Sequence, residues 1–102
     1  MDYKVTLSFL ENNLPAGGGF DSKWNITEKS NIFTCKTEYH CLNENGFYDG
    51  FLPFVVIINR KNPIDFKLHF TDRHIPYVRS LIRKYSDILR EYIEQTIMIM
   101  LE

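Results

Sequence analysis

The side chains that could do covalent or metal chemistry in this sequence are two cysteines and three histidines. The thiols are Cys35 and Cys41, and the imidazoles are His40, His69 and His74. A structural zinc site usually needs four such ligands at close spacings such as C-x-x-C, and the sequence has no such pattern. A Cys–His nucleophile pair also lacks a local signature, although its members need not be neighbours in sequence. We therefore expect no metal site, no cofactor and no catalytic residue.

Five arginines form the second chemical feature, and all of them lie in the second half of the chain. At about 100° per residue, one stripe of a helix would hold Arg79, Arg83, Ser86 and Arg90. Lys84 lies nearby in sequence. Guanidinium groups at this spacing suit phosphates or acidic side chains. The alternative is a solvated helix face with interleaved carboxylates as i, i+4 partners: Asp87, Glu91 and Glu94.

Aromatic residues near an expected turn form a third candidate site. Phe47 and Tyr48 directly follow an Asn-Gly pair, which tolerates the positive φ of tight hairpins, and Phe51 lies close behind them. Exposed aromatics at a turn anchor partner proteins, whereas the same rings folded inward would belong to the core. Both interpretations stay open from the sequence.

Length and charge limit the classes of protein that fit. The chain has 102 residues, of which 44% are hydrophobic and 25% charged, so we expect one globular domain over residues 1–102. The net charge is −1, with an acidic first half and a basic second half. This near-neutral balance argues against strong, unassisted binding of nucleic acid.

The spacing of hydrophobic residues along the sequence predicts the strands and the helix that carry these candidate residues. Apolar and polar residues that alternate with a period of two predict strands over residues 3–9, 23–27, 32–41 and 64–70, and a mainly apolar run predicts another over 47–59. A loop is expected over 11–20 and a turn at 43–46. Strand 47–59 is apolar on both faces and should lie centrally, with Pro53 at a bulge or an unpaired position. From Pro76 the period changes to that of an amphipathic helix. The sequence thus predicts an α+β fold, with about five antiparallel strands packed on one long C-terminal helix.

No stretch of the sequence indicates secretion or a membrane span. The N-terminus lacks the basic start and apolar core of a signal peptide, and the longest apolar runs are too short to cross a bilayer. Two cysteines six residues apart on one strand would be too distant for a disulfide. We therefore expect reduced thiols, a cytoplasmic location and no membrane partner.

Three segments carry a resemblance of style to a known group of proteins. These are NENGFYDG at residues 43–50, DFKLHF at 65–70 and REYIE at 90–94. Together they resemble pieces of small proteins encoded by phages and conjugative elements of Gram-positive bacteria. That group includes inhibitors of host defence, such as anti-CRISPR proteins directed at Cas9. The resemblance includes no diagnostic motif and transfers no functional residue.

The resemblance implies a non-enzymatic inhibitor that binds a larger protein, such as a Cas9-type nuclease, in a bacterial host cell. Many such inhibitors imitate DNA with a dense acidic surface, which a chain of net charge −1 with an arginine stripe does not fit. Docking on the nuclease, or obstruction of its guide-RNA assembly, fits better. In that mode Arg79, Arg83 and Arg90 make charged contacts and the hairpin aromatics anchor the complex. The alternative function is a small RNA- or DNA-binding module that uses the arginine stripe.

Overall fold

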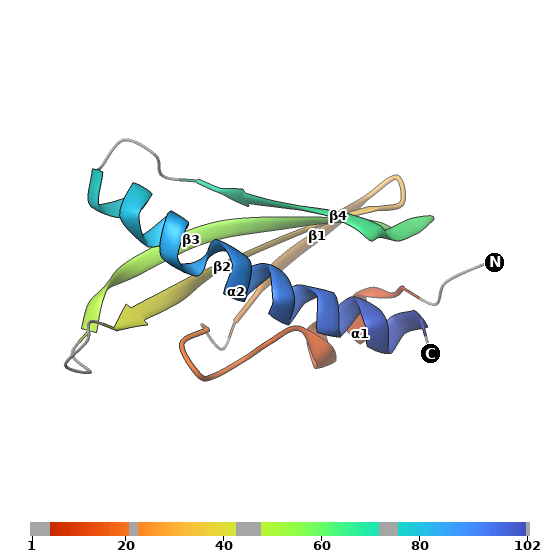
Figure 1. The fold of residues 1–102 in the computed structure, drawn as a ribbon. Helices are drawn as coiled ribbons and strands as arrows, with labels where there is room; N and C mark the ends of the chain where they lie inside the picture. The colour runs from red at the N-terminus through yellow and green to blue at the C-terminus, as the bar shows by residue number, and fades with distance from the viewer. Residues whose placement is uncertain (1–4, 21–22, 43–47, 72–75, 102) are drawn as a thin grey trace.

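A computed structural model describes residues 5–20, 23–42, 48–71 and 76–101 of the chain. The elements run α1 (Leu7–Asn13), β1 (Asn25–Lys29), β2 (Ile32–Leu42), β3 (Tyr48–Asn59), β4 (Asn62–Phe70) and α2 (Pro76–Leu101). The strands form one antiparallel sheet in the order β1-β2-β3-β4, and α2 crosses one face of it (Figure 1). The predicted α+β class and long C-terminal helix are confirmed, and the described sheet has four strands rather than about five.

The predicted strand over residues 3–9 is wrong where the structure describes it, because α1 begins at Leu7. Thr6 is the N-cap, and its hydroxyl oxygen accepts a hydrogen bond from the backbone N–H of Phe9 at 3.0 Å. Leu10 and Leu14 are both buried, at the four-residue spacing of a helix face. The predicted loop over 11–20 therefore starts only after Asn13.

A two-residue turn forms the first hairpin of the sheet. Ser30 and Asn31 join β1 to β2, and both have positive φ (50° and 69°). This is the conformation of a type I′ turn, whose twist matches that of the flanking strands. The expected turn at 43–46 lies outside the described residues, but β2 and β3 pair antiparallel on either side of it.

The central position predicted for the fourth strand segment is confirmed, because β3 pairs with β2 on one side and β4 on the other. Pro53 pairs in register with Glu38, so no bulge occurs there. Its carbonyl accepts a hydrogen bond from the N–H of Thr71 at 3.2 Å. The ring nitrogen of Pro53 points to the same side as its carbonyl, toward β4. Because β4 ends at Phe70, the missing N–H of Pro53 removes few hydrogen bonds between the strands.

The core lies between the sheet and α2. Alternate residues of β2 and β3 supply its sheet side, as the pattern over 32–41 predicts: Phe33, Cys35, Cys41, Leu52, Phe54, Val56 and Ile58 are buried. Leu89, Ile93 and Ile97 of α2 close it from the other side. The hydroxyl of Thr96 donates to the carbonyl of Asn13 at 3.3 Å and so ties α2 to the end of α1.

A glycine-rich turn closes one end of this core. Phe20 donates its N–H to the carbonyl of Gly17 at 3.1 Å, and its ring packs edge-on against Tyr39 at 5.0 Å between centroids. Gly19 has a φ of 113°, and a Cβ there would lie 2.7 Å from Cε2 of Tyr39. Only glycine fits this position without a shift of the Tyr39 ring.

Candidate functional site

Three of the predicted site residues lie on one side of α2, which we call the basic flank: Arg79, Arg83 and Arg90. All three side chains are exposed. The flank contacts β4 at Arg90, whose guanidinium carbon lies 5.7 Å from the centroid of the Phe66 ring. This cation–π contact holds Arg90 in place while its donors remain available at the surface. The arginine stripe is therefore formed by one continuous helix beside one edge of the sheet.

The carboxylates interleaved along α2 do not neutralise the basic flank by ion pairing. Arg83 and Asp87, and Arg90 and Glu94, are spaced i, i+4, yet neither pair makes a salt bridge among the described side chains. The described salt bridges lie elsewhere, at Arg60–Glu28 and Lys67–Asp65. The guanidinium groups of Arg83 and Arg90 are therefore not engaged with these carboxylates.

Lys84 lies apart from the basic flank. It is rotated by about 100° from Arg83 around the helix axis. Its ammonium nitrogen lies 5.4 Å from the centroid of the neighbouring Tyr85 ring. Lys84 therefore lies on a part of α2 that the arginines do not share.

The predicted aromatic anchor is only partly described. Phe47 lies outside the described residues, and Tyr48 is described only as the first residue of β3. Phe51, on the face of the sheet away from α2, is exposed and packs edge-on against His40 at 4.4 Å between ring centroids. Sequence reasoning did not single out this His40–Phe51 pair, although their opposition follows from the antiparallel register of β2 and β3.

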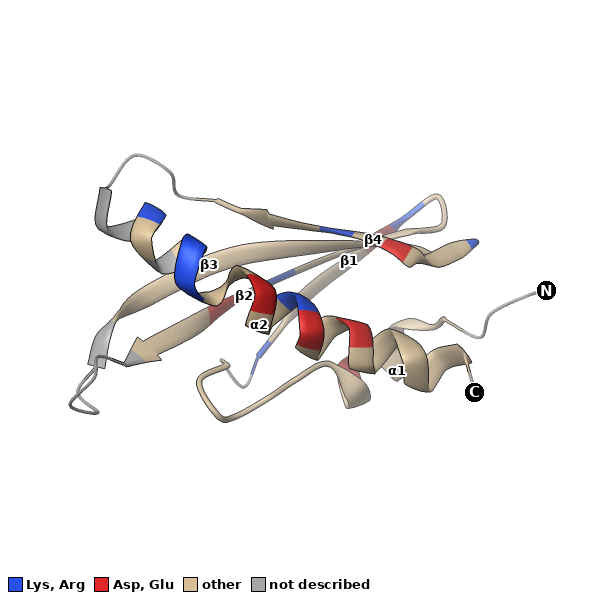
Figure 2. Ribbon diagram, viewed as in Figure 1, with Lys and Arg blue, Asp and Glu red and all other residues tan. Residues whose placement is uncertain are grey.

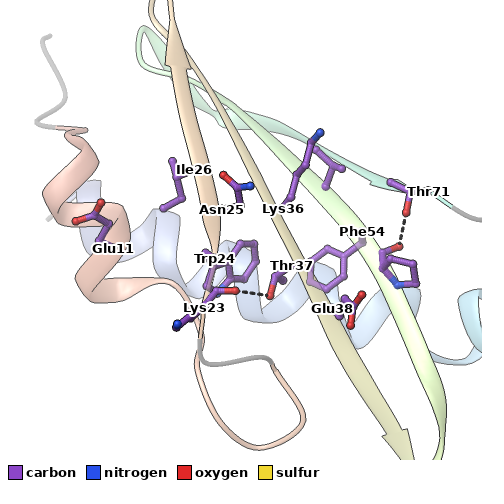
Figure 3. Close-up of a pocket in the computed structure, with 12 residues that line it drawn as sticks. Glu11, Lys23, Trp24, Asn25, Ile26, Lys36, Thr37, Glu38, Phe54 and Thr71 are labelled. Carbon is purple, nitrogen blue, oxygen red and sulfur yellow. Dashed lines mark hydrogen bonds between the residues drawn. The ribbon is translucent and has the colours of Figure 1, made fainter.

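A shallow hollow of about 690 Å³ is lined by residues of α1, β1, β2 and β3 (Figure 3). Its charged lining contains two lysines and two glutamates: Lys23, Lys36, Glu11 and Glu38. The indole N–H of Trp24 already donates to the carbonyl of Pro15 at 2.8 Å. With balanced charge and an engaged indole, the hollow does not select a ligand class.

The cysteines are placed for packing. Cys35 and Cys41 are both buried, and neither of these two described cysteines forms a disulfide bond. Burial raises the pKa of the Cys35 thiol to about 12, so the thiol is protonated at neutral pH and is a poor nucleophile. Within the described residues, no three His, Cys, Asp or Glu side chains are grouped so as to hold a metal ion.

Neither described helix is both long and apolar enough to cross a bilayer. Comparison with protein-family models, with curated protein sequences and with solved structures finds no match to this chain.

Proposed function

We propose that this protein is a non-enzymatic binding protein that docks on a larger protein through the basic flank of α2. Its partner is a host defence nuclease of the Cas9 type, and docking obstructs the nuclease or its assembly with guide RNA. The observation that carries the proposal is the alignment of Arg79, Arg83 and Arg90 along one side of α2, with Arg90 in contact with Phe66 of β4. The nuclease partner follows from the resemblance to phage and mobile-element proteins.

The placement of these arginines is unfavourable for the helix itself. Arg79 and Arg83 are four residues apart, and like charges at that spacing destabilise a helix by about 0.2–0.5 kcal/mol. The first turn of α2 has no acidic residue and its last turn no basic one, so neither end complements the helix dipole. The charge of Arg83, which gains nothing from this position in the helix, supports a role in recognition.

The pattern of charge favours a protein partner over nucleic acid. Acidic residues are interleaved with Arg90 along α2 (Figure 2), namely Asp87, Glu91 and Glu94, and they would repel a continuous phosphate backbone. Guanidinium groups pair equally well with carboxylates, and a protein surface offers them at separate points. The basic flank is therefore better suited to docking on a protein surface than to binding a nucleic acid.

The test measures complex formation and cleavage with a purified Cas9-type nuclease. We expect a stable complex and loss of cleavage at stoichiometric amounts. The variant Arg79→Glu/Arg83→Glu should bind at least about tenfold more weakly, which corresponds to roughly 1.4 kcal/mol. The matched control is Lys29→Glu/Lys61→Glu, which makes the same charge change at exposed sites away from α2 and should bind as the natural sequence does.

Three results would count against the proposal. Cleavage that persists at large molar excess refutes the nuclease partner. Equal binding by the arginine variant and the lysine control refutes the basic flank. Binding to RNA alone, weakening steeply with salt and lost in the arginine variant, would instead establish the nucleic-acid-binding alternative.

A further inference from the structure

A second side of α2, which we call the apolar row, is exposed without being part of the core or of the basic flank. It consists of Ile88, Tyr92 and Ile99, which are 42%, 43% and 51% exposed. Spacings of four and seven residues place them on one line along the helix. In Figure 1 no described element lies over the outer side of α2. A row of this kind on a surface helix is suited to another helix.

The charges beside the apolar row have opposite signs on either side of Ile88. At about 100° per residue, Lys84 lies one turn before Ile88 and Glu91 nearly one turn after it, on the same edge of the row. Such a helix matches a copy of itself that runs in the opposite direction, because Lys84 of each copy then lies near Glu91 of the other. A parallel copy would place like charges together.

From this self-complementarity we propose that the apolar row binds a second copy of the chain, as an antiparallel α2–α2 contact. Such an interface is isologous, so residues equally distant from its two-fold axis face each other. The midpoint of α2, with bounds Pro76–Leu101, falls beside Ile88. With the axis there, Ile88 meets Ile88 of the second copy. Lys84 then lies next to Tyr92 and Glu91 of that copy, and the same contacts occur twice.

This dimer is separate from the proposed docking of a nuclease. The row lies on the side of α2 where Tyr92 packs against Phe20, with ring centroids 5.4 Å apart. The basic flank lies on the side toward Phe66. Two helices touching over a few turns bury less surface than a standard interface, so the dimer should be weak, with a dissociation constant in the micromolar range.

Sedimentation velocity over a hundredfold range of protein concentration tests this inference. We expect a reversible shift from monomer to dimer. Ile88→Asp should weaken the dimer at least about tenfold. The matched control is Ile32→Asp, which changes an isoleucine of similar exposure (40%) on the open face of the sheet and should leave the dimer intact. A monomer at every concentration, or equal weakening by both variants, would overturn the proposal.

A charge exchange tests the antiparallel arrangement. Lys84→Glu and Glu91→Lys should each weaken the dimer, and the two changes together should restore it. Within one helix these residues are about 10.5 Å apart along the axis, so they do not form an i, i+4 pair that would explain the restoration. Circular dichroism of each variant establishes that α2 is still helical. Failure of the double variant to recover would show that these residues do not face each other across an interface.

Discussion

In the second half of α2, Leu89, Ile93 and Ile97 are buried against the sheet, and Thr96 is hydrogen-bonded to Asn13. In the first half, every described side chain is half-buried or exposed, and the charged ones are basic up to Lys84. One helix therefore has an anchored half and a charged half. The anchored half fixes the direction of the rod, and that rigidity allows the charged half to present guanidinium groups at a constant spacing.

The largest expected effect is a difference in stability between a substitution in the anchored half of α2 and one in the charged half. Leu89→Ala removes a fully buried side chain and should lower the free energy of unfolding by about 2–5 kcal/mol. Ile82→Ala, in the charged half, removes a side chain that is only half-buried and should have a clearly smaller effect. Urea unfolding of both variants measures the difference. Equal losses would show that the first half is anchored as firmly as the second.

A second effect concerns the core on which the anchored half packs. Burial raises the pKa of Cys35 from 9.0 to about 12, so above pH 9 the thiol ionises in the unfolded chain but not in the folded one. The folded state then binds more protons, and stability falls as pH rises, by at most about 1.4 kcal/mol per pH unit. Burial also raises the pKa of Tyr39, which acts in the same direction.

The measurement is the urea midpoint between pH 8 and pH 10 for the natural sequence and for Cys35→Ala. The alanine variant should start less stable and lose stability less steeply across this interval. Identical slopes would mean that the thiol does not contribute to the alkaline loss.

An intermediate effect lies at the boundary between the two halves. Arg90→Ala removes the contact of the guanidinium with the Phe66 ring and should destabilise the fold by about 0.5–1 kcal/mol. Glu91→Ala, one residue further along and exposed, should change stability very little. Thermal unfolding distinguishes the two variants. Equal shifts of the unfolding temperature would show that Arg90 does not contribute to the packing of α2 on β4.

The smallest effect has the opposite sign. Arg83→Gln relieves the like-charge pair with Arg79 and should stabilise the free protein by about 0.2–0.5 kcal/mol. The same change should weaken binding of the nuclease. A variant that gains stability and loses binding is expected where charge serves recognition rather than folding. Loss of stability without loss of binding would contradict this interpretation.

The sequence predicted most of this architecture where one period ran long enough. The helical pattern after Pro76 extends through α2, and the alternation over 32–41 marks the core face of β2. The first segment misled because Val5, Leu7 and Phe9 alternate by chance across the start of the short helix α1. The Thr6 cap and the spacing of Leu10 and Leu14 were the signals that would have identified it.

The candidate site was predictable in part. Helical spacing alone aligned Arg79, Arg83 and Arg90, whereas the contact of Arg90 with Phe66 depends on how α2 crosses the sheet. The direction of crossing is set by tertiary packing, which no local pattern encodes. The turn made by Ser30 and Asn31 was missed because this pair is less distinctive than Asn-Gly.

Amide hydrogen exchange with and without the Cas9-type nuclease measures which surface of this protein the complex covers. We expect that binding protects the backbone of residues 79–90 and leaves the open face of β2 and β3 unchanged. Protection confined to that open face, with exchange along α2 unaltered, would contradict the assignment of the charged half of α2 as the binding surface.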